Sequence, residues 1–78
     1  MIQKITREKA VSISTMIAPM NSKVLSSPEG AEFYLLTKEL LMGSYVVMAI
    51  DVFGALWVSD EEYRKDFESY LSKQPTKG

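Results

Sequence analysis

Carboxylates are the side chains of this sequence whose type and spacing could do chemistry. Asp51 stands alone in an apolar run, YVVMAIDVFGALWV, and three consecutive acidic residues follow at Asp60, Glu61 and Glu62. Paired carboxylates could act as general acid and base. The acidic triplet, however, lies where a helix is expected to begin, and helix capping together with the helix dipole explains it. Asp51 has no companion group, and a lone buried carboxylate would mostly stay neutral.

The residues that most enzymes and metal sites need are absent. With no histidine and no cysteine, the chain cannot form a Ser-His-Asp arrangement, a thiolate nucleophile or a usual zinc site. No glycine-rich loop follows an expected strand in the manner of a phosphate-binding or dinucleotide-binding motif. The five methionines fit adaptable packing better than metal ligation. We therefore predict a non-enzymatic protein with no cofactor and no metal.

Length and composition indicate one small folded domain. The chain has 78 residues, of which 46% are hydrophobic and 24% charged, and without disulfides a domain this small must pack tightly or associate. We expect a homo-oligomer, a dimer or higher.

The net charge of −1 argues against general nucleic-acid binding. The charged start MIQKITREK and the short apolar runs predict a cytoplasmic protein without signal peptide or membrane contact.

The first segment is expected to be helical. Thr6 can cap the first turn, and apolar residues then recur on about a third of the helical circumference until Pro19 interrupts the pattern. We predict a helix over residues 7–18, although alternating apolar and polar residues in this segment also allow a strand. Residues 1–5 could add a short N-terminal strand, and residues 18–27 form the expected linker.

A second helix is predicted over residues 28–42. The stretch SSPEG offers Ser27 as N-cap and Pro28 at the first helical position, and Gly43 is a suitable stop. Apolar side chains would surround this helix almost completely: Phe33, Leu36 and Leu40 on one side, Ala31, Leu35 and Met42 on the other, Tyr34 and Leu41 towards a flank. Such a helix is normally buried on several sides. Either the other elements wrap it, or its second face meets another subunit.

The apolar run around Asp51 predicts a β-hairpin. Its β-branched and aromatic residues favour strands over 45–50 and 55–58, with a turn over 51–54. Asp51 is then a turn residue whose carboxylate bonds to nearby backbone amides. Both faces of the first strand are apolar, and a single packed helix would cover only one of them.

The last element is predicted to be a helix over residues 60–73. Ser59 and Glu62 match a capping box. A single apolar stripe follows, formed by Tyr63, Phe67, Tyr70 and Leu71. The tail 74–78 is expected to be frayed. The fold class is therefore α+β, a small single domain of two N-terminal helices, a hairpin and a C-terminal helix.

These features favour a small interaction protein, an accessory, inhibitor or regulator that binds a protein partner through apolar surfaces. The candidate contact residues are Phe53, Val52, Trp57, Tyr34, Leu41 and Met42. One alternative is a winged-helix-like DNA regulator, with the hairpin as wing; the absence of Lys and Arg from that hairpin argues against it. Another is a small-molecule sensor with an aromatic pocket around Tyr45, Trp57 and Tyr63.

One partial resemblance bears on the source of the chain. The segment GSYVV followed by DVFGALWVSDEEYRKDFESY resembles a hairpin-then-helix ending of small phage-encoded proteins. It covers about a third of the chain, and its positions are generic. The resemblance implies a mobile-element protein, such as an inhibitor of a host defence or regulatory complex. It implies no site residue and no activity.

Overall fold

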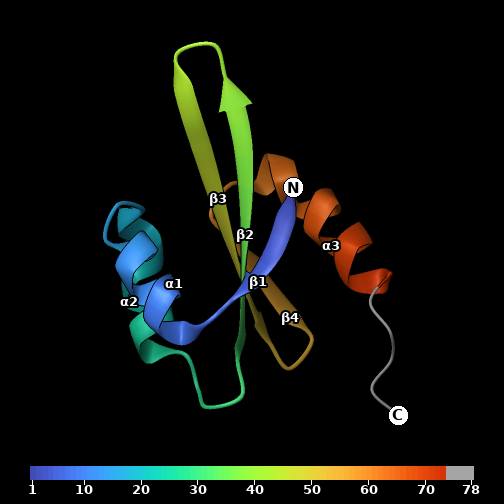
Figure 1. The fold of residues 1–78 in the computed structure, drawn as a ribbon. Coiled ribbons are helices and arrows are strands. Elements are labelled where there is room, and N and C mark those ends of the chain that lie inside the picture. Colours follow the sequence, from blue (N-terminus) through green and yellow to red (C-terminus); the bar gives the residue numbers. More distant parts are fainter. Residues whose placement is uncertain (74–78) are drawn as a thin grey trace.

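The computed structural model describes residues 1–73 and has a four-stranded antiparallel sheet with helices on both faces (Figure 1). The elements are β1 (Ile2–Ile5), α1 (Arg7–Ser14), α2 (Ala18–Ser26), β2 (Glu32–Leu40), β3 (Gly43–Val52), β4 (Ala55–Val58), the 3-10 helix η1 (Glu61–Tyr63) and α3 (Arg64–Ser72). The strands lie in the order β1-β2-β3-β4. The predicted α+β class is confirmed, and the predicted short N-terminal strand is present. The predicted tail 74–78 lies outside the described residues.

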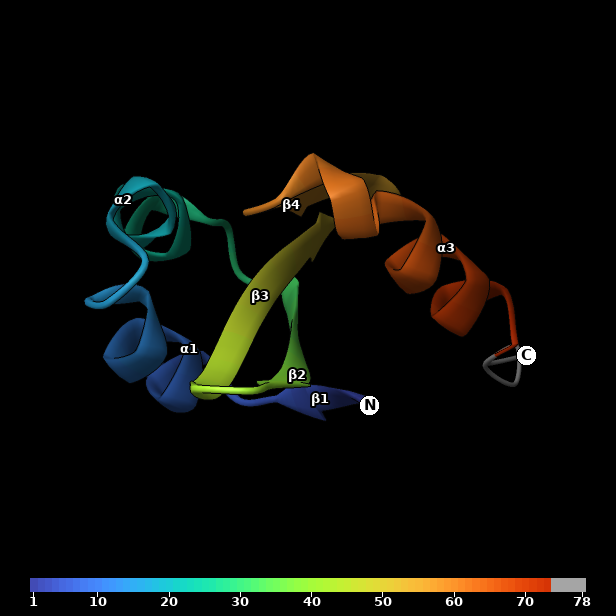
Figure 2. The ribbon, with the colours of Figure 1, turned by 90° about the horizontal axis from the view of Figure 1, so that it is seen from above.

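The sheet has two hydrophobic cores, one on each face. Helices α1 and α2 cover one face, and α3 covers the other (Figure 2). The first core contains Ile5, Ala10, Met20, Val24, Phe33, Leu35, Met48 and Ile50, and the second contains Tyr34, Leu36, Val47, Ala49 and Phe67. Adjacent residues of β2 and β3 thus belong to different cores, because successive side chains of a strand point to opposite faces.

The predicted helix over 28–42 is wrong, because this segment contains strand β2. Its four consecutive buried residues, from Phe33 to Leu36, lie alternately on the two covered faces of the sheet. A strand buried on both faces is apolar at successive positions and loses the alternation that normally marks a strand. The stretch SSPEG forms a turn instead of a helix start: Ala31 donates its amide proton to the carbonyl of Pro28, and Gly30 has φ +96°.

The first helical segment is divided into two helices. Thr6 caps α1 as predicted, accepting from the amide of Lys9 at 3.2 Å. The predicted helix over 7–18 is too long, since α1 ends at Ser14. The predicted linker 18–27 is also wrong: Pro19 stands in the first turn of α2, where its missing amide proton costs nothing. Within α2, Met20 and Val24 are one helical turn apart, and both are buried.

Arg7 ties these helices to the sheet. Its guanidinium donates to the carbonyl oxygens of Val24 (3.2 Å) and Pro28 (2.9 Å) and to the hydroxyl of Ser27 (3.0 Å). The same guanidinium lies over the ring of Phe33, 5.2 Å from its centroid. One side chain therefore provides hydrogen-bond donors both to the end of α2 and to the turn that leads into β2.

The predicted hairpin is confirmed, with a longer first strand, the predicted second strand and a shorter loop. Val52 pairs with Ala55, so the loop consists of Phe53 and Gly54. The carboxylate of Asp51 accepts from the amide of Gly54 at 2.8 Å. The prediction that Asp51 is a turn residue bonding to backbone is confirmed as well.

The C-terminal helix is confirmed, but its cap differs from the prediction. Asp60, rather than Ser59, accepts from the amide of Glu62 at 3.1 Å. Ser59 instead accepts from the amide of Met48 at 3.0 Å and donates its own amide proton to the carbonyl of Met48. The predicted apolar stripe packs on the second core through Phe67, Tyr63, Tyr70 and Leu71. Among the described residues, no helix has the length and apolar character needed to cross a membrane.

Candidate functional site

The paired strands β2 and β3 extend beyond the rest of the sheet. Strand β1 pairs with β2 only as far as Leu36, and β4 pairs with β3 only as far as Ala49. We call residues 37–46, which continue past both neighbours, the arm (Figure 1). A two-stranded ribbon gains little stability by itself. The arm therefore needs contacts from elsewhere.

The tip of the arm is apolar and exposed to solvent. Leu40 is 58% exposed, and Leu41 and Met42 are close to fully exposed. No charged residue occurs between Leu40 and Val46. Leu41 and Met42 were predicted as contact residues for the second face of a helix; the structure places them in a two-residue hairpin loop. Sequence reasoning missed Leu40 as part of this surface, since it was assigned to the side of that helix opposite Met42.

The 3-10 helix η1 and its N-cap residue Asp60 contact one face of the arm. The hydroxyl of Tyr45 donates to the carboxylate of Asp60 at 2.7 Å, and this bond raises the pKa of Tyr45. The rings of Tyr45 and Tyr63 are 6.2 Å apart, and the ammonium of Lys38 lies 5.7 Å from the centre of the Tyr63 ring. The base of the arm is thus positioned by polar and aromatic contacts, while its tip has none of these.

A hollow of about 430 Å³ adjoins the base of the arm. It is lined by Met16 and Ile17 from the loop between α1 and α2, by Ser44, Tyr45 and Val46 of β3, and by Ser59. Met16 is 77% exposed. The hollow and the tip both belong to the same end of the sheet, so a partner that binds one lies within reach of the other.

The opposite end of the sheet carries the second candidate surface. Phe53 is 74% exposed and has φ +53°, a conformation that costs a non-glycine residue of the order of 1 kcal/mol. Its ring lies over Gly30, where an added Cβ would be 3.2 Å from the Phe53 Cε1 atom. Val52 is half-buried and packs against the first core. A strained, exposed aromatic residue at a loop tip is a feature that binding sites often retain.

Trp57 does not join the predicted aromatic pocket. It is 38% exposed, and the ammonium of Lys23 lies 4.3 Å from its ring centroid, on the side of α2. Tyr63 packs on the core that α3 covers on the other face of the sheet, and Tyr45 lies beside Tyr63. The prediction of one pocket shared by Tyr45, Trp57 and Tyr63 is therefore wrong.

Tyr34 is a core residue rather than a contact residue. It is only 5% exposed, and its ring packs edge-on against that of Tyr70 at 5.9 Å. Its hydroxyl donates to Glu32 at 3.2 Å. Burial, reinforced by the negative charge of Glu32, raises the pKa of Tyr34 to about 12. The prediction of Tyr34 as a surface contact followed from the wrong helix over 28–42.

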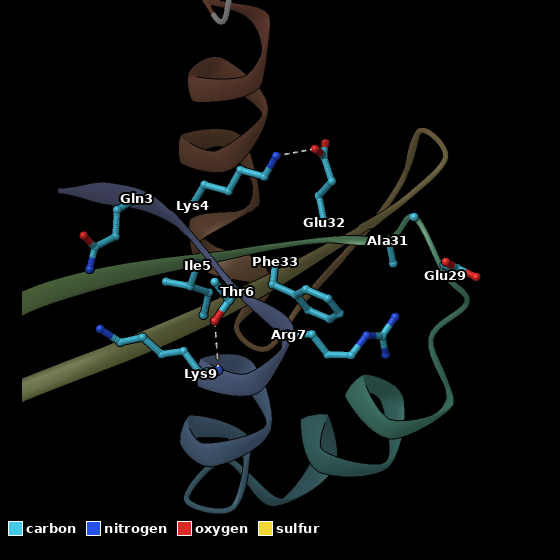
Figure 3. Close-up of a pocket in the computed structure, with 11 residues that line it drawn as sticks. Gln3, Lys4, Ile5, Thr6, Arg7, Lys9, Glu29, Ala31, Glu32 and Phe33 are labelled. Carbon is cyan, nitrogen blue, oxygen red and sulfur yellow. Dashed lines mark hydrogen bonds and ion pairs between the residues drawn. The ribbon is translucent and has the colours of Figure 1, made fainter.

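A larger hollow, of about 720 Å³, lies between the start of α1 and the beginning of β2 (Figure 3). Ile5 and Phe33 give it an apolar floor, and the ion pair of Lys4 with Glu32 forms part of its rim. Arg7, another lining cation, is occupied by the end of α2. Lys4, Glu32 and Arg7 thus have contacts within the fold, and Lys9 and Glu29 also line the hollow. No group of three potential metal-ligating residues occurs within residues 1–73.

Comparison of the chain with models of known protein families, with curated proteins and with solved structures finds no match. Function must therefore be argued from the surfaces themselves. Among the six predicted contact residues, the structure brings Leu41 and Met42 together at one end of the sheet and Val52 and Phe53 together at the other. Trp57 lies on the face covered by α2, and Tyr34 is removed from the surface.

The backbone strain at Phe53 predicts that Phe53→Asn increases stability. Asparagine tolerates positive φ better than phenylalanine, and Asn-Gly is the preferred pair for such a loop. We expect the free energy of unfolding, measured with urea, to rise by about 1 kcal/mol. Phe53→Ala is the matched control, because it removes the ring without relieving the backbone. A Phe53→Asn protein no more stable than Phe53→Ala would contradict strain at this position.

The raised pKa of Tyr34 predicts a loss of stability at alkaline pH. Since the folded protein holds this tyrosine neutral up to pH about 12, its contribution is complete below the unfolded pKa of about 10 and falls as pH rises from 10 towards 12. Urea unfolding at pH 8, 10 and 11.5 should show a decrease of the order of 2 kcal/mol that is much smaller in Tyr34→Phe. Equal pH dependence in the two proteins would contradict the assignment.

Proposed function

We propose that this chain is a non-enzymatic protein-interaction module, an accessory protein or inhibitor, whose contact surface is the arm. The observation that carries the proposal is the exposure of Leu40, Leu41 and Met42 at the end of a hairpin that the domain itself does not cover. Large apolar side chains gathered in this way are costly to leave in water and are characteristic of binding surfaces. Methionine and leucine also adapt their shape to a partner.

The side chains that could serve in catalysis support the same proposal. The chain has no histidine and no cysteine, and three of the four carboxylates that could do chemistry have structural tasks. Asp51 closes a turn, Asp60 caps η1 and binds Tyr45, and Glu61 pairs with Arg64 at 2.6 Å. A cytoplasmic setting and an origin in a mobile element, inferred from the sequence, belong to the same proposal.

The winged-helix alternative loses its structural basis. It needed a helix over residues 28–42 ahead of the hairpin, and that segment contains β2 in the middle of the sheet. The arm and the loop at Phe53 and Gly54 bring no cluster of Lys or Arg to either tip. Binding to nucleic acid is driven largely by such cations. No observation favours a DNA-binding role over the interaction module.

Affinity purification of the tagged chain from cells that encode it tests the proposal. A specific partner should be recovered with the native chain and reduced at least about tenfold with Leu41→Ser/Met42→Ser, because hot-spot residues each contribute more than ~1 kcal/mol. Phe53→Ser is the matched control, since it also removes an exposed apolar residue, from the opposite end. Recovery that is insensitive to the tip and lost on Phe53→Ser would move the contact surface to the loop at Phe53.

A further inference from the structure

Strand β3 has an open, uncharged edge within the arm. The amide and carbonyl of Met48 both bond to Ser59, so they point away from β2. Amide and carbonyl groups alternate in direction along an antiparallel strand. Those of Val46 and Ser44 therefore point the same way as those of Met48, but β4 has already ended there. Four backbone hydrogen-bonding groups at Ser44 and Val46 have no partner within residues 1–73.

The other edges of the sheet are protected against pairing. Strand β1 presents Lys4 on a four-residue edge. On β4, the outward carbonyl of Leu56 is already occupied by the guanidinium of Arg64 at 2.8 Å. The β2 side of the arm carries Lys38 and Glu39. Short strands and charged side chains are the usual protections of sheet edges. The segment from Ser44 to Val46 has none of these protections.

The open edge also suits a two-fold axis. The exposed tip lies at one end of this edge, the 430 Å³ hollow runs along it from Ser44 to Val46, and Ser59 lies beside Met48 at its other end. A two-fold axis beside Tyr45 would set Ser44 opposite Val46 of a second copy and Val46 opposite Ser44. That register directs each tip towards the hollow of the other copy. One symmetry operation thus satisfies the open backbone groups and covers both tips, as an isologous interface requires.

We infer that the partner of the arm is a second copy of this chain, paired antiparallel along Ser44–Val46 with Tyr45 on the two-fold axis. This inference rests on the proposed function, because it names the occupant of the same surface. The two sheets then continue through β3 of each copy, and the tip residues Leu41 and Met42 enter the hollow lined by Met16, Ile17 and Ser59. The two Tyr45 rings become cross-strand neighbours on the face of α3, an arrangement that stabilises strand pairs.

The charge distribution favours a copy over a lipid surface. Residues 40–46 contain no charge, so the pairing of the two strands sets no like charges directly opposite each other. A membrane-inserting loop usually carries Lys or Arg beside its apolar tip to contact anionic headgroups. Here the only flanking charges are one lysine and one glutamate, at Lys38 and Glu39.

Cysteine cross-linking tests the register directly, because the native chain has no cysteine. In the paired arms the two residues at position 45 form a non-hydrogen-bonded pair with Cα atoms roughly 4.5 Å apart, which is within disulfide range. Tyr45→Cys should therefore give a covalent dimer under mild oxidation. Leu41→Cys is the matched control: it is at least as exposed, but its two copies would be roughly 26 Å apart along the arms.

We expect Tyr45→Cys to cross-link at least about tenfold faster than Leu41→Cys, since a disulfide requires this proximity. Circular dichroism of both variants verifies the fold. Equal rates, or faster cross-linking of Leu41→Cys as in a tip-to-tip contact, would overturn the inference.

A proline pair provides the second measurement. Ser44→Pro removes an amide of the open β3 edge, and Glu39→Pro removes the outward amide of the residue opposite it on β2. Light scattering should give twice the 8.8 kDa chain mass for the native protein and for Glu39→Pro, and the monomer mass for Ser44→Pro. A monomeric native protein that still recovers another protein through its tip would refute the dimer and leave the proposed function intact. A dimer that cross-links through position 45 but recovers no other protein would support the inference and refute the role as an accessory protein or inhibitor.

Discussion

Strands β2 and β3 pair without interruption from Glu32 with Asp51 to Leu40 with Gly43, and every other element is placed by this ribbon. The part of this ribbon outside the arm is buried on both faces, so it requires a helical layer on each face. Helices α1 and α2 form one layer, and α3 forms the other. By covering both faces with its own elements, the chain buries a larger share of its apolar surface than one covered face would allow. The same pairing, continued past β1 and β4, produces the arm.

Local signals in the sequence predicted three features: strand-forming composition the hairpin, a turn residue the turn at Asp51, and a periodic apolar stripe the C-terminal helix. Periodicity failed for β2, where burial on both faces removes the alternation and leaves a run of apolar residues that fits a buried helix equally well. The strong helix-start signal at Ser27 and Pro28 reinforced the error. Gly30, which has positive φ in the structure, was the signal for a turn that could have corrected it. Helix α2 was missed because its serines and Pro19 resemble a linker.

The contact surface could be predicted only in part. Leu41 and Met42 were selected because a helix apolar all round seemed to need a second partner, whereas their exposure comes from the length of the hairpin beyond its neighbours. That length depends on where β1 and β4 end, which is a tertiary property. Tyr34 was misplaced for the same reason, since its burial follows from the sheet and from Tyr70. Phe53 was identified from a local signal, an aromatic residue in a tight turn, and it does lie exposed there.

The cores on the two faces close within one chain, so association is not needed to bury them. What stays open is the arm, with its apolar tip and the unpaired edge from Ser44 to Val46. Amide hydrogen exchange of the native protein tests this account most directly. The account predicts that the amides of Ser44 and Val46 are protected, that their protection falls on dilution, and that the outward amide of Glu39 exchanges rapidly throughout. Exchange of Ser44 and Val46 as rapid as that of Glu39 at every concentration would contradict it.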